Sequence, residues 1–298
     1  MSGTFDGKTT GTPISLIVHN KDYISKDYNN IKDIYRPSHA DFTYDKKYGF
    51  RDYRGGGRAS ARETVARVCA GAIAKKILND LGINILAYTS SVGHIKLKKI
   101  DLSYIYENPL KMPCKEAVKE ATIFLDNLIK ENNSIGGTAH CEITGLKAGI
   151  GEPVFEKLDA MLSKAIMSIG ATKGIEFGLG FLASEKKASQ YNDIFYSENE
   201  QILKKTNNSG GILGGMSDSS KITINIAFKP TPSISIPQST INTKLENTNV
   251  EIKGRHDPFI VPRAIPIIES MVAITLIDYI LINMTKKIDC VKYAYLNF

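Results

Sequence analysis

The sequence predicts an α+β fold, in which helices and strands follow one another in mixed order. Segments with apolar residues three and four positions apart indicate amphipathic helices. Residues 222–228 alternate apolar and polar side chains, which indicates a half-buried strand. Because helices and strands do not alternate regularly along the chain, the pattern favours an α+β fold over a doubly wound one.

The first third of the chain contains one expected strand, one long polar segment and one expected helix. Residues 14–18 form a short apolar run that predicts a buried strand. Residues 19–57 are rich in Tyr, Asp, Lys, Arg and Gly and show little periodicity, as segments that carry binding residues often do. Apolar residues between positions 65 and 81 recur at helical spacing, and Gly82 is a stop signal.

Two further amphipathic helices are expected near residues 115–131 and 153–169, the second with Pro153 in its first turn. Besides the strand at 222–228, residues 250–253 predict another strand. The longest apolar stretch, residues 260–282, is interrupted by Arg263, Glu269 and Asp278. We therefore interpret this stretch as a buried helix rather than a membrane span.

Composition restricts the class of protein. The chain has 298 residues, a net charge of +7 and a pI near 9.0, and it is long enough to bury a sizeable core. The basic balance suggests an acidic partner such as nucleic acid, anionic lipid or a phosphorylated metabolite, although solvated lysines alone would give the same balance. The four cysteines form no CxxC pair, which indicates neither a zinc site nor a disulfide framework and fits a reducing compartment. The amino-terminal residues do not have the pattern of a signal peptide.

The most informative motif is RDYRGGGRASARET at residues 51–64. Its glycines lead directly into an expected helix start, where unpaired backbone N–H groups and a partial positive charge attract anions. Arginines at positions 51, 54, 58 and 62 surround this helix start. The motif predicts a phosphate or carboxylate site, and the alternative is a plain glycine-rich turn before a helix.

Four weaker motifs add to this one. NNSGGILGG at 207–215 would let the backbone wrap a flat or phosphorylated ligand, and KPTPS at 229–233 offers Lys229 and hydroxyls to a phosphate. Taken alone, the first is better explained as a flexible hairpin and the second as a proline-rich strand exit. GRHDP at 254–258 offers Arg255 as an anion binder and Asp257 as a proton acceptor, or forms a capping turn. RPSHAD at 36–41 places His39 between arginine-bearing stretches.

Other site classes are not indicated. The remaining histidines considered, His19, His94 and His140, have no comparable neighbours in the sequence and are expected to be structural. No Cys or His cluster has metal-ligand spacing, and GxSxG, P-loop and dinucleotide-binding motifs are absent from the sequence. A nucleic-acid-binding protein has little support, because the chain has no Trp and no RNA-binding motif. The residues alone thus predict a cytosolic enzyme with several anion-binding loops and a candidate proton donor.

Taken together, these motifs resemble the chorismate synthase family. The resemblance rests on RPSHAD, YGFRDYRGGGR from Tyr48, RET from Arg62, GIGEP from Gly149, SGGILGG from Ser209, KPTPS and GRHDP, which also match in order and spacing. It extends from Gly3 to the last expected helix. Each motif is weak alone, but their ordered combination is specific.

The resemblance implies a fold and a reaction. Members have an α+β sandwich of helices and antiparallel sheets with an internal duplication, and we expect residues 1–298 to form a single such domain. They convert 5-enolpyruvylshikimate 3-phosphate to chorismate and phosphate, a trans 1,4-elimination that needs reduced FMN, in the shikimate pathway of aromatic amino acid biosynthesis. The resemblance also implies a cytoplasmic homotetramer, with no nucleic-acid or membrane partner. Both substrate and cofactor are phosphorylated anions, which accounts for the arginines and the basic pI.

The resemblance also implies roles for particular residues. His39 corresponds to the histidine that protonates the flavin, Asp257 to the carboxylate that assists removal of the substrate's ring proton, and Ser60 to the serine that supports this relay. Arg58, Arg255 and His39 would also contact the substrate. The residues expected to hold FMN are Arg58, Ala59, Ser60, Gly170, Ala171, Gly214, Lys229, Pro230, Thr231, Pro232, Ser233 and Arg255.

One departure from the family pattern concerns the start of the chain. Members carry a TFGESHG motif and a paired-arginine segment before the position that corresponds to Met1. The chain is therefore expected to lack a histidine that serves the departing phosphate and arginines that bind substrate. The alternative to an active lyase is then a catalytically impaired protein that still binds FMN or phosphate. External supply of reduced flavin is favoured over an intrinsic NADPH-dependent activity, because no separate nicotinamide-binding domain is indicated.

Overall fold

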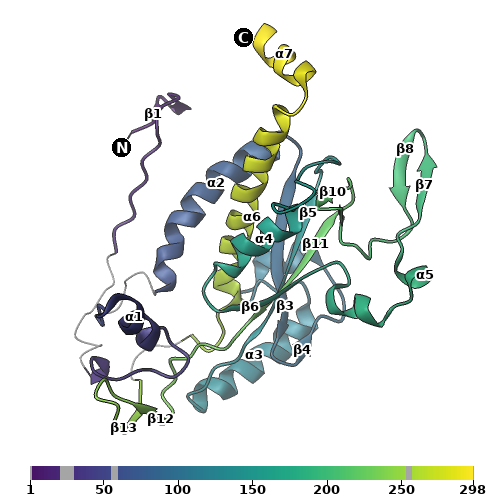
Figure 1. Ribbon diagram of the computed structural model, residues 1–298. Coiled ribbons are helices and arrows are strands. Elements are labelled where there is room, and N and C mark those ends of the chain that lie inside the picture. The colour runs from purple at the N-terminus through teal and green to yellow at the C-terminus, as the bar shows by residue number, and fades with distance from the viewer. Residues whose placement is uncertain (1, 21–29, 55–59, 253–256, 298) are drawn as a thin grey trace.

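A five-stranded antiparallel sheet forms the centre of the protein (Figure 1). The computed structural model describes residues 2–20, 30–54, 60–252 and 257–297. The strands lie in the order β4-β3-β5-β11-β6. Their bounds are Asn84–Val92 for β3, Ile95–Lys96 for β4, Gly137–Thr144 for β5, Thr172–Phe177 for β6 and Ile222–Phe228 for β11. Helices and antiparallel strands in mixed order confirm the α+β prediction.

Strand β11 has the alternation that the sequence predicts. Ile222, Ile224 and Ile226 are fully buried, whereas the intervening residues are only partly buried. Ile224 pairs with Cys141 of β5 on one side and with Phe177 of β6 on the other. The apolar face of the sheet is therefore continuous across neighbouring strands, because residues that pair across antiparallel strands point to the same face.

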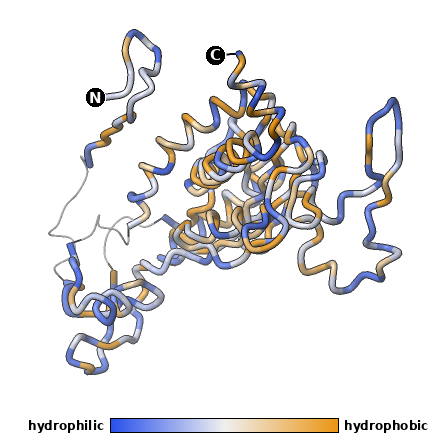
Figure 2. Tube along the Cα trace, turned by 45° about the horizontal axis from the view of Figure 1, so that its top comes forward, coloured by the Kyte–Doolittle hydropathy of each residue, from blue (hydrophilic) through white to orange (hydrophobic). Residues whose placement is uncertain are grey.

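Three helices pack over this apolar face: α2 (Val65–Asp80), α4 (Leu158–Met167) and α6 (Val261–Met284). Helices α2 and α6 cross closely at Gly71, where an added Cβ would lie 2.2 Å from the Cβ of Ser270. Helix α3 (Lys115–Lys130) packs against the edge strand β4. Figure 2 shows that apolar residues gather in this sheet-and-helix body.

Helix α6 is long and apolar enough to cross a membrane by length and composition, but half of its most apolar window is buried inside the structure. Its one buried carboxylate, Glu269, accepts hydrogen bonds from Lys75 Nζ at 2.5 Å and from the backbone N–H of Ala87 at 2.9 Å. A buried charge is tolerated when it is paired and hydrogen-bonded in this way. The packing agrees with the prediction of a buried helix.

A smaller unit lies beside one end of the sheet (Figure 1). It combines α1 (Asp41–Tyr48) with the hairpin β12–β13 (Gln238–Ile241 and Asn247–Val250). Ile31, Val250 and Ile252 form its own small apolar cluster. Two segments distant in the chain are joined here, since Tyr35 N donates to Ile241 O.

The remaining elements are short and peripheral, and most lie in loops or at the ends of the chain. They are β1 (Thr4–Phe5), β2 (Lys8–Thr9), the 3₁₀ helices Ala61–Thr64, Leu102–Glu107 and Gly180–Glu185, α5 (Ala188–Tyr191), β7 (Phe195–Glu198), β8 (Gln201–Lys204), β9 (Ile212–Leu213), β10 (Met216–Ser217) and α7 (Ile288–Leu296).

The structure corrects several boundaries. Residues 14–18 form no strand and are exposed, because they have no strand partner among the described residues. Helix α4 begins at Leu158 rather than near Pro153, because the residues before it pack against the Gly215 turn: Gly151 bridges Met216 and Leu158 N donates to Gly215 O. The strand expected at 250–253 lies earlier, at β13, and residue 253 is outside the described residues.

Candidate functional site

Lys229 marks the point where three parts of the protein meet. It directly follows β11, as the sequence predicts. Its backbone N–H donates to Ala171 O at 3.0 Å, and its Nζ donates to Ser38 O at 2.8 Å. The first bond holds the turn after α4 and the second holds the small unit, so both lie at the Phe228 end of β11.

Lys229 is a cation whose one side-chain hydrogen bond among the described residues goes to a backbone carbonyl. Burial, and then the nearby charge of Lys173, lower the pKa of Lys229 below its usual value. Among the described residues, no carboxylate forms an ion pair with Lys229. Two lysines held close together without a carboxylate favour binding of an anion.

Residues after Lys229 bring a further polar group and a carboxylate to the same end. Thr231 O accepts a hydrogen bond from Ser134 Oγ at 2.7 Å, whereas Thr231 Oγ1 is buried without a partner in the described parts of the chain. The neighbouring Ile135 N donates to Pro258 O at 2.9 Å, which places Asp257 near the segment that carries Thr231. Asp257 forms an ion pair of 2.8 Å with Arg263 at the start of α6, but it does not cap this helix, whose N-cap is Ile260.

The turn at Gly170 and Ala171 has an unusual backbone. Ala171 has φ of 70°, in the left-handed region that side chains with a Cβ rarely adopt. A Cβ added at Gly170 would meet nothing within 4 Å, so this backbone is open to a ligand. Arg67 of α2 holds the turn in place by donating to Ser168 Oγ at 2.6 Å, and Glu63 pairs with Arg67 at 2.9 Å.

Ser60 lies before α2 and caps the short 3₁₀ helix Ala61–Thr64. Its Oγ accepts a hydrogen bond from Arg62 N at 3.3 Å. This capping supports the predicted helix start after the glycine-rich motif. Ser60 precedes the start of α2, and Figure 1 shows that this end of α2 faces the small unit.

His39 belongs to a compact network on the small unit. Its Nδ1 lies 3.0 Å from Asp41 Oδ1 and 3.0 Å from Arg36 Nη2. Arg36 donates to both oxygens of Asp41 at 2.7 Å through Nε and Nη2. Burial opposes ionisation of Asp41, but hydrogen bonds from Arg36 and His39 outweigh it and hold the pKa of this carboxyl well below its usual range.

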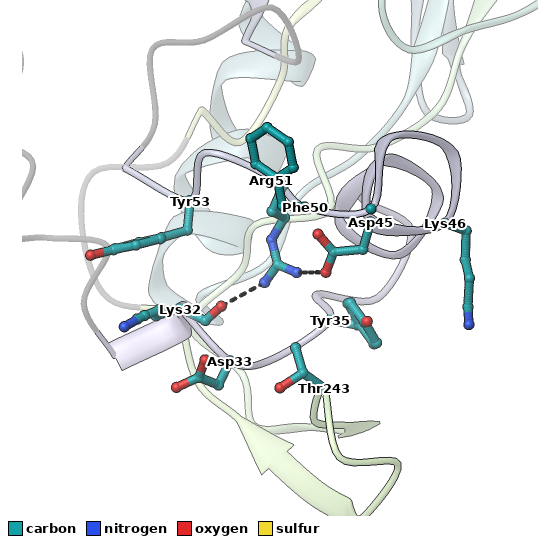
Figure 3. A pocket seen from close by; sticks show the side chains of 10 residues that line it. Lys32, Asp33, Tyr35, Asp45, Lys46, Phe50, Arg51, Tyr53 and Thr243 are labelled. Carbon is teal, nitrogen blue, oxygen red and sulfur yellow. Dashed lines mark hydrogen bonds and ion pairs between the residues drawn. The ribbon is translucent and has the colours of Figure 1, made fainter.

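Arg51 clamps the small unit from the other side (Figure 3). It pairs with Asp45 of α1 and donates to the carbonyls of Lys32 at 2.8 Å and Ile34 at 3.0 Å. A pocket of about 440 Å³ lies beside this clamp, with Tyr35 in its wall. The clamp ties α1 to the chain just before residue 36, so the RPSHAD turn is held at both ends.

Gly214 lies elsewhere. It occupies the turn between β9 and β10. This turn lies near the Ile222 end of β11, because Asp218 just after β10 donates its backbone N–H to Gly211 O just before β9. Six residue steps along a strand span roughly 20 Å, so Gly214 and Lys229 lie at opposite ends of β11. The predicted site residues therefore do not all come together within one chain.

Buried charges hold this glycine loop in place. Lys204 Nζ lies 3.5 Å from Asp193 and 2.5 Å from Asp218, and all three side chains are almost fully buried. Asp193 also accepts from the backbone N–H groups of Asn208 and Ser209 at 2.7 and 3.0 Å. Burial opposes ionisation of Asp193, but hydrogen bonds led by that of Thr206 hold its pKa well below the usual range.

The structure thus gathers most of the predicted site residues at the Phe228 end of β11. These are His39, Gly170, Ala171, Lys229, Pro230, Thr231, Pro232, Ser233 and Asp257. The hydrogen bonds of Ser60 are with Arg62 and Glu63 of its own helix start. Arg58, Ala59 and Arg255 lie outside the described residues. Sequence reasoning gave no role to Lys173, Arg67 or Asp41. Only Asp41 had a usable signal, because it lies two positions after His39 in the same motif.

Comparisons with known proteins show the family of this chain. A family profile described as "Chorismate synthase" matches residues 1–281. The chain belongs to the chorismate synthase family. A chorismate synthase of Agathobacter rectalis is 52% identical over 297 residues, and one of Lachnospira eligens is 53% identical over the same length. Each alignment covers 99% of this chain and 81% of the relative.

A solved structure extends the comparison to the fold. A protein described as "Crystal Structure of Chorismate Synthase" superposes with a TM-score of 0.77 and 29% identity, covering 99% of this chain and 82% of that one. The predicted family is confirmed. Chorismate synthases are carbon–oxygen lyases of aromatic amino acid biosynthesis that act on a small-molecule substrate and use a flavin.

Proposed function

We propose that this chain, acting as a single domain over residues 1–298, removes phosphate from 5-enolpyruvylshikimate 3-phosphate by trans 1,4-elimination to give chorismate, with FMN as its flavin. We further propose that it works in the cytoplasm as a homotetramer with externally reduced flavin. The observation that carries the proposal is Lys229 at the Phe228 end of β11, which has no carboxylate partner in the part of the chain that the structure describes. Such a cation suits a phosphorylated ligand, and both FMN and the substrate are phosphorylated.

The residues present fit an FMN phosphate. Lys229 and Lys173 supply positive charge, and the buried Thr231 hydroxyl has no hydrogen-bond partner among the described residues. A buried polar group without a partner costs free energy, which a phosphate oxygen that accepts its hydrogen would recover. The open backbone at Gly170 would allow a flat ring to approach closely. Pro230 and Pro232 would keep this segment extended.

Reduced FMN, when bound, supplies the electron-rich ring that assists the elimination without net oxidation. His39 is the proposed proton donor to the bound flavin. The carboxylate of Asp257 is proposed to assist removal of the substrate's ring proton, and Ser60 to support that transfer through its hydroxyl. Arg58 and Arg255 would hold the anionic groups of the substrate and flavin. Positive charge near the departing phosphate would stabilise the negative charge that builds on it during the elimination.

Replacement of the proposed proton-transfer residues tests this function. His39→Ala and Asp257→Asn should each lower kcat by about 10²–10⁴-fold, the usual contribution of a general acid or base. Both variants should retain FMN binding. The measurement is chorismate formation under anaerobic conditions with reduced FMN and the phosphorylated substrate.

His140→Ala is the matched control, because His140 lies within β5 and contacts Asn225 and Glu142 rather than the residues proposed to act in proton transfer. Near-normal turnover in His39→Ala or Asp257→Asn would show that the assignment of that residue is wrong. An unmodified chain that binds FMN but forms no chorismate would instead identify a flavin-binding protein without lyase activity.

A further inference from the structure

Asp41 is the carboxylate that contacts the ring of His39, and it can accept a proton-bearing ring nitrogen's hydrogen bond. It is the first residue of α1 and is nearly fully buried. Its Oδ1 lies 3.0 Å from Nδ1 of the imidazole. Between described residues, no hydrogen bond uses Nε2 of His39, so the two ring nitrogens have different surroundings.

The proton on Nδ1 follows from the state of Asp41. Arg36 donates to both carboxylate oxygens at 2.7 Å and its backbone N–H donates to Oδ2 at 3.1 Å, so Asp41 is ionised and only accepts. An ionised oxygen 3.0 Å from Nδ1 is favourable only if Nδ1 carries hydrogen. Arg36 Nη2 also lies 3.0 Å from Nδ1 and would donate to it only if Nδ1 carried no hydrogen, but the same nitrogen donates to Asp41 Oδ1 at the shorter distance of 2.7 Å.

Among the described residues, Asp41 is the one anion against the ring. Arg36 lies on one side of Asp41, and Arg51 Nε lies 3.9 Å from Asp41 Oδ1 on another. Lys229 Nζ bonds to the carbonyl of Ser38, the residue before His39. Asp45, the next carboxylate along α1, pairs with Arg51 instead. The charged groups that surround the ring are therefore cations, and Asp41 alone can hold a proton on the ring by hydrogen bonding and charge.

We propose that Asp41 is a positioning residue that fixes neutral His39 in the tautomer with hydrogen on Nδ1, so that Nε2 is the atom that takes up a proton from solvent and then donates it to the bound flavin. This inference rests on the proposed function for the role of His39, but the tautomer itself is a property of the chain. Buried Asp41 and the Arg36 fork also fix the direction of the ring, as a carboxylate does for histidines that act in proton transfer.

The tautomer is measured directly on the whole chain. The protein is labelled with ¹⁵N-histidine and measured at a pH high enough for the ring of His39 to be neutral. The His39 signals should then show a protonated Nδ1 and an unprotonated Nε2. A His39→Gln sample identifies those signals among the five histidines of the chain. A neutral His39 with hydrogen on Nε2 in the unmodified protein would overturn the proposal, and this measurement needs no variant to fold.

Asp41→Asn gives the functional readout. The amide can turn its NH₂ group toward Nδ1, so the ¹⁵N signals should shift toward the Nε2–H tautomer, and kcat should fall on the order of 10²-fold while FMN affinity stays within about twofold. Asp45→Asn removes a carboxylate from the same helix that does not touch His39, and should leave the tautomer unchanged. An unaltered tautomer and kcat in Asp41→Asn would contradict the proposal. The unmodified protein could also have no turnover while Asp41→Asn still changes the tautomer. That result would contradict the proposed function and leave the tautomer proposal intact.

Discussion

The two ends of strand β11 hold lysines in opposite electrostatic settings. At the Ile222 end, Lys204 lies between Asp193 and Asp218, and its side chain is 3% exposed. At the Phe228 end, Lys229 bonds to a carbonyl oxygen and has another lysine nearby. A cation matched by carboxylates inside the protein stabilises a loop, whereas a cation left without one remains available for a ligand. The comparison therefore separates an architectural end from a candidate binding end.

The largest effect should come from breaking the lysine–aspartate cluster at the Ile222 end. Lys204→Met would leave Asp193 and Asp218 buried without a cation. Breaking a buried ion pair in this way costs about 3–5 kcal/mol, so the free energy of unfolding should fall by that amount. Urea unfolding followed by circular dichroism measures the change. Exposed Lys205 is the control, because Lys205→Met should change stability by less than about 0.5 kcal/mol.

Acid should weaken the same cluster. The folded pKa of Asp193 lies below the unfolded value of about 3.9, so its stabilising contribution is present above that pH and is lost as pH falls through the folded pKa. Unfolding curves taken at decreasing pH below about 4 should show this loss. Asp193→Asn should be less stable near neutral pH and should lose less stability on acidification. An equally steep loss in Asp193→Asn would place the acid sensitivity at other carboxylates.

A substitution of Lys229 at the Phe228 end should have the smallest effect on stability but should clearly weaken ligand binding. Lys229→Met should weaken FMN or substrate binding on the order of tenfold, because a hydrogen bond to a charged group contributes about 1.5–3 kcal/mol. Stability should change little. The control is Lys221→Met at the other end of the region, where Lys221 pairs with Glu142 at 2.9 Å. Ligand titrations that weaken equally in both variants would remove the distinction between the two ends.

Sequence patterns correctly predicted those helices and strands whose periodicity is set by one buried face. The helix expected at 65–81, the helix near 115–131 and the alternating strand at 222–228 appear as α2, α3 and β11, because one buried face sets the period of each. Helix α1 was not predicted, since its only buried residue is Asp41 and it has no apolar stripe. The start of α4 was misplaced because contacts with Gly215, distant in sequence, override the helix signal of Pro153.

The candidate site shows the same limit. Motifs such as KPTPS and RPSHAD identified Lys229 and His39 as candidates. They did not indicate that a hydrogen bond from Lys229 to Ser38 O brings the two motifs together. The position of Gly214 at the far end of β11 follows from chain topology, which a motif does not encode. The role of Asp41 depends on a distance of 3.0 Å between two side chains. Local sequence thus identified chemical groups, and tertiary contacts decided their partners.

The close crossing of α2 and α6 at Gly71 acts as a pivot for the binding end. From this contact, Val65 at the start of α2 lies roughly 9 Å away and Val261 at the start of α6 roughly 14 Å away along the helix axes. A side chain larger than hydrogen at position 71 would force the axes apart or rotate them. A rotation of about 10° would move the start of α6 by about 2 Å, and displacements of about 1 Å can already cost 10²-fold in rate. The missing Cβ at position 71 thus permits the close spacing of α2 and α6, whose starts follow Ser60 and Asp257 in the sequence.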